Sequence, residues 1–352
     1  MTSEALSGAD QTEQIAARSA ARIRRVFAIA LLLLLAAALP FLVSNYRTFQ
    51  LTLMIAYAIA LLGLNILTGY NGQISLGHGA FFAVGSYIAA IMMDHWDLPY
   101  WSTLPAAGAV CFAAGFLFGL PALRLEGLYL ALATFALAVA TPQILKHKSI
   151  EAWTGGAQGI AITKPQAPWH LPLSPDQWLY FVALAVAVVM FVIGSRLVRG
   201  RVGRALVAIR DNPTAAASMG VNTALYKTTT FGISAFFTGV AGALSAIAVQ
   251  FVAPDSFGFL LSISFLVGIV IGGLASISGA IYGAFFIEFV PNIADSISKS
   301  APWAVYGVFL VASVYFMPVR RGRRGERRRP PAFPPLARRH NIFGRKQLKK
   351  DI

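Results

Sequence analysis

The chain has 352 residues, of which 57% are hydrophobic and 12% are charged, and its formal net charge at pH 7 is +15. Soluble domains usually carry about 25% charged residues, so this composition excludes an ordinary soluble domain and favours a membrane protein with several spans. The single cysteine, Cys111, excludes a disulfide within one chain and any cysteine-based metal cluster. Its apolar surroundings predict a buried side chain.

Apolar segments recur along most of the chain, and there are about ten of them. A helix needs roughly 20 predominantly apolar residues to cross a bilayer, which matches the length of most of these segments. The predicted fold class is therefore all-α: a polytopic membrane helix bundle of about ten transmembrane or re-entrant helices. The segments are 26–44, 50–68, 73–93, 104–122, 127–145, 178–195, 228–250, 260–275, 277–291 and 302–318.

This pattern predicts three parts of the chain. An N-terminal segment covers residues 1–25, a transmembrane domain covers 26–318, and a basic tail covers 319–352. Residues 26–39 have the Leu-rich composition of a signal peptide, but no convincing small-residue cleavage site follows them. We interpret them as part of the first span.

The Lys and Arg residues predict the orientation, because they concentrate in cytoplasmic connections. Four arginines precede the first span, five lie between Arg196 and Arg210, and thirteen of the 29 basic residues follow Met317. An even number of spans places all three groups on one side. We therefore expect a multi-pass protein with both termini in the cytoplasm, whose tail lies near anionic membrane lipid and does not bind nucleic acid.

The long connection over residues 146–177 is predicted to face the opposite side, and it is rich in Pro and Trp. One interpretation is an aromatic belt at the membrane interface, with turns. Its glycine-rich stretch also suggests a gate or docking surface, because closely spaced glycines let the backbone fold tightly. The candidate residues of this loop are Trp153, Thr154, Gly155, Gly156 and Gly159.

A polar interruption between two apolar segments predicts a short helix over about 212–220. Asp211 and Asn212 are capping residue types, Pro213 suits the first helical position, and Gly220 suits a left-handed residue after the last turn. This helix is far too short to cross a bilayer, so it lies beside the membrane, where a partner protein would hold it. The candidate contact residues are Arg210, Asp211, Asn212, Pro213, Thr214, Ala215, Ala216, Ala217, Met219 and Gly220.

Two apolar segments, one in each half of the chain, are interrupted by glycines. Small residues allow close packing of membrane helices, and glycine-interrupted segments also indicate broken helices that line a transport pathway. The candidate residues are Gly72, Gln73, Ser75, Gly77, His78, Gly79, Gly272, Gly273, Gly279, Gly283 and Glu288. His78 is interpreted first as a neutral side chain hydrogen-bonded to a neighbouring helix. Glu288 is a pathway candidate, although a carboxylate near the membrane surface also reaches water.

Catalytic and metal-binding patterns are absent from the sequence. None of the five histidines has the spacing to another His, Cys or carboxylate that a metal site requires, and no phosphate-binding loop of the Gly-x-x-x-x-Gly-Lys type occurs. We therefore expect no enzyme activity, and an ATPase serving this chain would be another polypeptide. No series of Asp, Glu or Lys residues runs through the spans, which disfavours a proton-coupled carrier without excluding a stand-alone carrier.

Five motifs, in this order, closely resemble the LivM-type inner-membrane permeases of branched-chain amino acid ABC importers. The resemblance covers roughly residues 50–318. The motifs are GQISLGHGAFFAVGSY (72–87), RLEGLYLALATFALA (124–138), TGGAQGI (154–160), GRALVAIRDNPTAAASMGVN (203–222) and IGGLASISGAIYGA (271–284).

The resemblance implies a permease domain in a bacterial inner membrane that pairs with a LivH-type permease. It further implies two cytoplasmic ABC ATPase subunits, which bind ATP and Mg²⁺, and a periplasmic substrate-binding protein; the chain itself holds no cofactor. The short helix would be the coupling helix that contacts the ATPases. Related systems carry urea or small organic and aromatic acids, and these stay alternative substrates.

Part of the motif departs from the pattern of ABC importer permeases, which often carry E-A-A-x-x-x-G in the coupling helix. Ala215, Ala216 and Gly220 match, but Thr214 occupies the acidic position, and the downstream Ile-x-Leu-Pro is absent. The contact chemistry with the ATPases is therefore open. The tail after Met317 lies outside the resemblance.

Overall fold

The computed structural model describes residues 30–297 apart from Glu126 and 169–171, together with five isolated positions. These positions are Arg24, Phe27, Gly307, Val308 and Val311. Almost all of the predicted N-terminal segment, the predicted span 302–318 and the basic tail lie outside the described residues.

The described chain is almost entirely helical, with one two-stranded sheet. An apolar helix, Ala30–Leu42, comes first. The elements that follow are α2 (Asn45–Asn65), the π-helix η1 (Ile66–Tyr70), α3 (His78–Asp94), α4 (Tyr100–Ala122), α5 (Leu128–Leu145), α6 (Glu151–Thr154), β1 (Ile160–Ala161), α7 (Pro175–Arg199), α8 (Arg201–Asp211), α9 (Pro213–Ser218), α10 (Thr223–Val249), β2 (Phe251–Val252), the 3-10 helix η3 (Pro254–Phe257), α11 (Phe259–Gly272) and α12 (Gly279–Ile297).

Six helices of the described residues are long and apolar enough to cross a membrane, and two shorter apolar helices accompany them. The six are Asn45–Tyr70, Tyr100–Ala122, Leu128–Leu145, Pro175–Arg199, Thr223–Val249 and Pro254–Gly272. The predicted all-α polytopic bundle is therefore confirmed. One predicted segment differs, because residues 73–77 are not helical and α3 begins only at His78.

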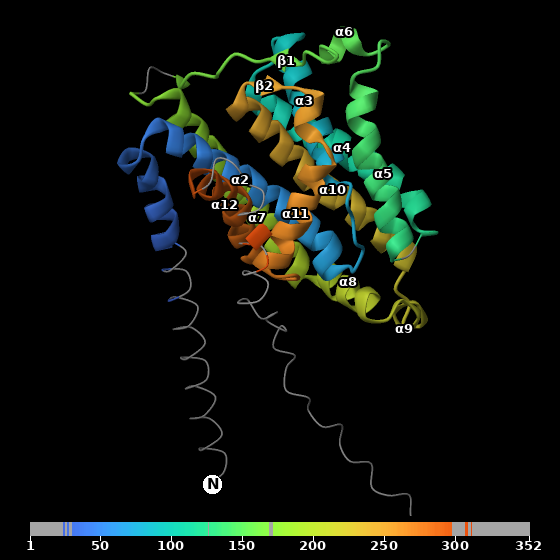
Figure 1. Ribbon diagram of the computed structural model, residues 1–352. Coiled ribbons are helices and arrows are strands. Elements are labelled where there is room, and N and C mark those ends of the chain that lie inside the picture. The colour runs from blue at the N-terminus through green and yellow to red at the C-terminus, as the bar shows by residue number, and fades with distance from the viewer. Residues whose placement is uncertain are drawn as a thin grey trace, which may run out of the picture. The chain divides into compact units, whose positions relative to one another are not determined.

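α10 is the central helix of the bundle, and it packs against α2, α3 and α4 (Figure 1). Glycines make this packing possible. A Cβ atom at Gly85 would lie 2.2 Å from the carbonyl oxygen of Gly239, and a Cβ atom at Gly242 would lie 2.1 Å from that of Phe82. In lipid, such close backbone contact replaces the hydrophobic driving force that stabilises soluble cores.

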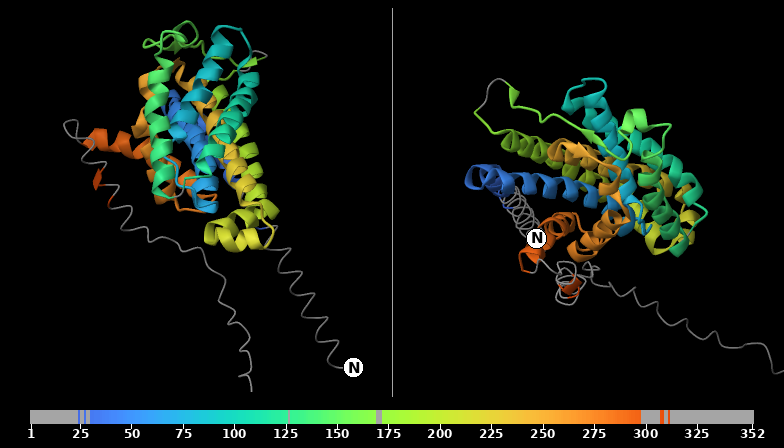
Figure 2. Two further views of the ribbon diagram at one scale, coloured as in Figure 1. Left: turned by 90° about the vertical axis from the view of Figure 1, so that its right-hand side faces the viewer. Right: turned by 45° about the horizontal axis from the view of Figure 1, so that its top comes forward.

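The bundle has two ends, which the views in Figures 1 and 2 show clearly. α6, β1 and β2 lie at one end, here called the sheet end, and α8 and α9 lie at the other, here called the α9 end. At the sheet end, β1 and β2 pair antiparallel, with Ile160 opposite Val252. This pairing holds β1, in the long connection between α5 and α7, against the segment that follows α10.

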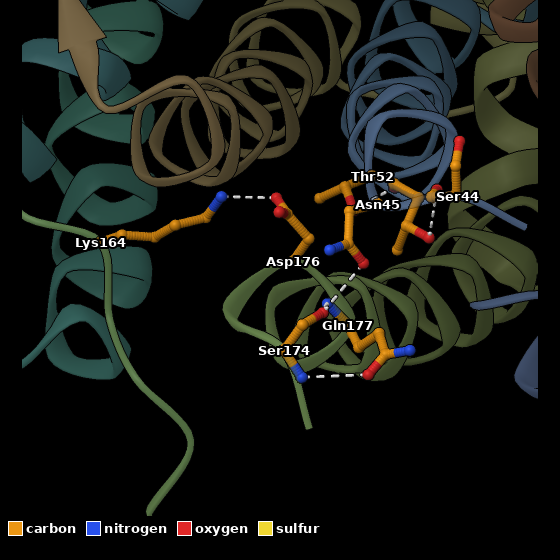
Figure 3. Close-up of polar contacts among 8 residues, drawn as sticks. Ser44, Asn45, Thr52, Lys164, Ser174, Asp176 and Gln177 are labelled. Carbon is orange, nitrogen blue, oxygen red and sulfur yellow. Dashed lines mark hydrogen bonds and ion pairs between the residues drawn. The ribbon is translucent and has the colours of Figure 1, made fainter. Parts of the chain in front are cut away.

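The same connection is also fastened where α7 begins (Figure 3). Ser174 and Gln177 form a capping box at the N-terminus of α7, and the Ser174 hydroxyl donates to the side-chain oxygen of Asn45 at 3.3 Å. Lys164 in the connection pairs with Asp176 of α7 at 2.5 Å, with both side chains mostly buried. The connection is therefore a folded part of the protein along much of its length.

Candidate functional site

The arginine-rich interruption folds as two helices, whereas the sequence predicted one. α8 is amphipathic: Leu206 and Ile209 are buried, while Arg201 and Arg204 are exposed. Its apolar side packs against α7 and α10. Because apolar residues recur at helical spacing throughout α8, this segment forms a helix on the bundle rather than a loop.

α9 has the predicted ends. The Asn212 side chain accepts a hydrogen bond from the Ala215 amide at 3.0 Å, and Pro213 occupies the first position. After the last turn Gly220 is left-handed, with φ of 83°. One expectation was wrong: Asp211 does not cap α9, because it is the last residue of α8 and its carboxylate pairs with Arg210 at 3.1 Å.

α9 presents its residues to the outside at the α9 end of the bundle. Thr214, Ala215 and Ala217 are exposed, and Met219 is 86% exposed, whereas Ala216 is only 5% exposed. Met219 follows the last residue of α9, so its side chain extends the exposed face at the C-terminal end of the helix. The exposed face of α9 therefore offers a partner protein a rigid, mostly small-residue surface.

Arg210, an exposed residue at the end of α8, reaches across to the end of η1. Its Nη1 donates to the carbonyl oxygen of Gly69, in η1, at 2.8 Å. Gly72 is left-handed, with φ of 77°, and a Cβ atom there would lie 2.7 Å from Cγ of Arg210. The structure thus brings together two candidate residues, Arg210 and Gly72, that the sequence had assigned to separate sites.

His78 is buried at the start of α3 and uses both ring nitrogens. The Ser234 hydroxyl donates to the Gly63 carbonyl at 2.6 Å, so it accepts from Nε2–H of His78, also at 2.6 Å. Nδ1 then accepts from the Ser75 hydroxyl at 3.0 Å. With this assignment the ring is neutral, and its partners hold it between α2, α3 and α10.

The neighbouring candidates in this segment pack closely against other helices. A Cβ atom at Gly77 would lie 2.9 Å from the carbonyl oxygen of Thr134, and one at Gly79 would lie 2.5 Å from Oγ of Ser262. The Gly79 amide donates to the same Ser262 oxygen at 2.9 Å. Gln73 is buried and accepts from the Asn71 side chain, two residues away, at 2.8 Å.

The second glycine-rich segment is a broken element, as predicted. α11 ends at Gly272 and α12 begins at Gly279, and each of these glycines would place a Cβ atom within 2.4 Å of the other's carbonyl oxygen. Gly283 packs in the same way on Gly268, and Gly273 has φ of 103°. These glycines let α11 and α12 cross at close range, while a pathway role for them stays a prediction.

Glu288 lies on α12, partly buried, and is separate from His78. Both nitrogens of His78 are taken by serines, so the two candidates share no hydrogen bond. α12 packs against α2 and α11. Glu288 is therefore placed near the α2–α12 contact, and its role in transport stays a prediction.

The loop candidates at the sheet end form a tight turn that only glycines allow. Gly155, Gly156 and Gly159 all have positive φ, and a Cβ atom at Gly159 would lie 2.3 Å from the carbonyl oxygen of Val252. The buried Thr154 hydroxyl donates to the Leu145 carbonyl at 2.8 Å. The turn thus joins the end of α5 to β2.

Trp153 extends this turn outward. Its ring stacks on His95 with centroids 5.2 Å apart, and it is 47% exposed. Trp96 packs edge-on against Trp153. The sheet end therefore carries an exposed aromatic group on a rigid turn, which suits the predicted docking surface.

Within the described residues, no group of three or more His, Cys, Asp and Glu side chains is arranged to hold a metal ion. The sequence analysis missed three residues that organise the interior: Ser234, Ser262 and Thr134. Each lies in an apolar helix where a lone hydroxyl residue carries no sign of its partner. Asn65, at the end of α2, bonds to the connection between α11 and α12.

Comparisons with known proteins agree with this architecture. A family model described as the permease component of the branched-chain amino acid transport system matches residues 46–317. The high-affinity branched-chain amino acid transport permease LivM of Escherichia coli (strain K12) is 37% identical over 287 residues, which cover 75% of this chain and 67% of the relative. No solved structure matches the chain.

More distant relatives carry the same kind of description. The high-affinity branched-chain amino acid transport permease LivH of Salmonella typhimurium is 25% identical over 268 residues, covering 71% of this chain and 83% of the relative. The corresponding permease BraD of Pseudomonas aeruginosa is 26% identical over 258 residues, covering 67% and 81%. The chain is thus similar along most of its length to transport permease components.

Proposed function

We propose that this chain, which belongs to the family of branched-chain amino acid transport system permease components, is one of two permease subunits of an ABC importer. Its partner is a LivH-type permease, and the pathway for the amino acid lies between the two. Two cytoplasmic ATPase subunits bind ATP and Mg²⁺, and a periplasmic binding protein delivers the substrate. The proposed substrate is a branched-chain amino acid, the class named for the relatives.

The observation that carries the proposal is α9. α9 is a six-residue helix with a hydrogen-bonded N-cap that packs on the bundle through Ala216 and exposes its other small residues, followed by the almost fully exposed Met219. It suits a groove on an ATPase subunit, and a stand-alone carrier would not need it. We propose that the α9 end faces the cytoplasm and the sheet end the periplasm, an orientation that the arginines of α8 support.

The mechanism follows from how α8 connects α9 to the bundle. Closure of the ATPase subunits around ATP displaces α9, and α8 transmits that displacement because it packs against both α7 and α10. Since α10 is the central helix, its movement repositions the permease against its partner. Alternating access then arises from the two permeases rocking around the pathway, and substrate selection is left mainly to the binding protein.

Purification from native membrane, followed by reconstitution into proteoliposomes, tests this proposal. We expect a second permease and two P-loop ATPases to co-purify with the chain, and we expect uptake of radiolabelled leucine to require ATP and the binding protein. Uptake of urea or of an aromatic acid in place of leucine would contradict the substrate. Transport by the isolated chain without ATP would contradict the importer as a whole.

The sheet end supplies a separate prediction about the binding protein. Gly159→Ala forces a side chain against the Val252 carbonyl at a left-handed position, so it should displace β1 from β2 and with it the turn that carries Trp153. We expect the affinity of the loaded binding protein for the importer in nanodiscs to fall about tenfold, a loss of about 1.4 kcal/mol.

Gln158→Ala is the matched control for this prediction, because Gln158 is exposed in the same turn and its removal leaves the backbone free to keep its shape. Its binding affinity should stay close to that of the unmodified protein. If the Gly159→Ala variant binds the loaded binding protein as tightly as the unmodified protein and keeps its melting profile, the turn is not part of the docking surface.

A further inference from the structure

The end of α2 changes from α-helix to π-helix over Ile66–Tyr70, where the Asn71 amide reaches back five residues to the Ile66 carbonyl at 3.3 Å. π turns are rare and frequently occur at functional sites. Two side chains, one on each side of this turn, tie it to distant parts of the chain. We call the turn and its two ties, Arg210 and Asn65, the η1 junction.

The first tie comes from the end of α8. The Arg210 guanidinium donates from Nη1 to the Gly69 carbonyl at 2.8 Å, and from Nε and Nη2 to the Asp211 carboxylate at 3.2 and 3.1 Å. Hydrogen bonds to Gly69 and Asp211 therefore hold the Arg210 guanidinium. A movement of the connection between α8 and α9 would act directly on the Gly69 carbonyl in η1. The absence of a side chain at Gly72 leaves room for the Arg210 stem.

The second tie reaches the connection between α11 and α12. Asn65 is 1% exposed, and its amide nitrogen donates to the carbonyls of Ser276 at 2.8 Å and Gly273 at 3.3 Å. Its side-chain oxygen accepts from the Ala275 amide at 2.8 Å. Ala275 has φ of 58°, an unfavourable conformation for a residue with a Cβ atom, so Asn65 holds this connection in a shape that it would not adopt alone.

Gly69 lies between the two ties and touches both. Its carbonyl accepts from Arg210, and a Cβ atom on it would lie 2.1 Å from the Asn65 side-chain oxygen and 2.4 Å from the Ala275 amide nitrogen. Because there is no room for a side chain between Gly69 and these groups, a displacement of Gly69 toward them would change the bonds of Asn65. The register of a π turn offers such a displacement, because it converts to an α turn by exchanging one set of backbone hydrogen bonds for another.

We propose that the η1 junction couples the position of α8 and α9 to the conformation of residues 273–278, with Arg210 and Asn65 as its positioning residues. This inference rests on the proposed function, since it supplies one route by which ATPase closure reaches the transmembrane helices. Because residues 273–278 connect α11 to α12, the junction would act on how these two helices cross.

The test uses the reconstituted importer with a Ser278→Cys reporter, whose position is exposed in the connection, while the native Cys111 is buried. The rate of N-ethylmaleimide modification is measured without nucleotide and after trapping with ATP and vanadate. We expect trapping to change the rate about tenfold in the otherwise unmodified importer, within the ordinary range of coupling between sites.

Asn65→Ala is the decisive variant, because Asn65 is buried and lies outside the exposed face of α9. It should still co-purify with the ATPases, yet lose the nucleotide-dependent change in modification rate and about tenfold in leucine taken up per ATP hydrolysed. Arg210→Ala should also lose the nucleotide-dependent change, and Arg210→Lys should keep part of it. The double alanine variant should be no worse than either single one, because the two ties act in series.

Matched controls are Arg204→Ala, which removes an exposed arginine from the same helix, and Asn292→Ala, which removes an exposed asparagine from α12. Both should retain the nucleotide-dependent change. The proposed coupling through the η1 junction is contradicted if the nucleotide-dependent change in modification rate persists in the Asn65→Ala and Arg210→Ala variants. It is also contradicted if the losses of the two single variants add up in the double variant. If the unmodified importer shows no ATP-dependent uptake, the proposed function fails instead, so the two failures are distinguishable.

Discussion

Ala217→Glu should abolish ATP-driven uptake while leaving insertion of the protein in the membrane intact. Ala217 is exposed on α9, so the new carboxylate meets water in the isolated subunit and disturbs no internal packing. In the assembled importer it would be buried against an ATPase subunit without a partner, and an unpaired buried charge at an interface centre costs several kcal/mol. A loss of about 3 kcal/mol corresponds to more than a hundredfold weaker ATPase binding.

The measurement is ATPase co-purification together with leucine uptake in proteoliposomes. Thr214→Glu is the matched control, because it adds the same charge to the same helix, at the N-terminal turn where a carboxylate is favourable and where other importers carry an acidic residue. We expect this variant to keep its uptake. Wild-type uptake by the Ala217→Glu variant would mean that α9 does not contact the ATPases.

Ala216 is the wrong position for this experiment, although the sequence alone makes it equivalent to Ala217. It is 5% exposed, so a larger side chain there would disturb the packing of α9 against the bundle as well as any contact with a partner. A loss of uptake in an Ala216 variant would not separate these two causes.

Gly242→Val should prevent the bundle from folding. The added Cβ would lie 2.1 Å from the Phe82 carbonyl oxygen and 3.1 Å from the Ser86 amide nitrogen, both backbone atoms of α3. Rotamer changes cannot relieve a clash with backbone, so α3 and α10 would have to separate, and the hydrogen bond from the Ser86 hydroxyl to the Gly242 carbonyl at 2.9 Å would be lost. Overpacking usually costs about 1–3 kcal/mol, and a backbone clash at the centre lies at or above the upper limit.

Thermal unfolding in detergent, followed by size-exclusion chromatography, measures this effect. We expect little monodisperse protein for Gly242→Val. Gly258→Ala is the control, because a Cβ atom there would meet only the Asp255 carbonyl oxygen at 4.0 Å and its φ of −61° suits any residue. A Gly242→Val variant as stable as the control would show that the α3–α10 contact tolerates a side chain.

Much of this protein could be predicted from local signals. Apolar runs predicted the membrane helices, and the sequence Asn212–Pro213 predicted where α9 begins, because capping depends on residues a few positions apart. The glycines of 272–283 predicted a broken helical segment, again because the signal lies in residues that are close together in the sequence. α8 was missed as a separate helix because its arginines were interpreted as loop charges, whereas its alternate face carries the buried Leu206 and Ile209.

The contacts that join these elements could not be predicted in the same way. Arg210 bonds a carbonyl 141 positions away, and Asn65 bonds the Ala275 amide 210 positions away. Both partners are backbone groups, which every residue possesses, so no residue type at the receiving end marks the contact. The serine partner of His78 is equally hidden, because one serine in an apolar helix usually bonds its own backbone.

The pairing of β1 with β2 also constrains the order of synthesis. Ile160 finds Val252 only after α7, α8, α9 and α10 have been made and the last of them has crossed the membrane. A nascent chain that stops within α10 would already contain α9 but would lack the finished sheet end. Biogenesis therefore completes the two ends of the bundle in sequence, the α9 end first and the sheet end second.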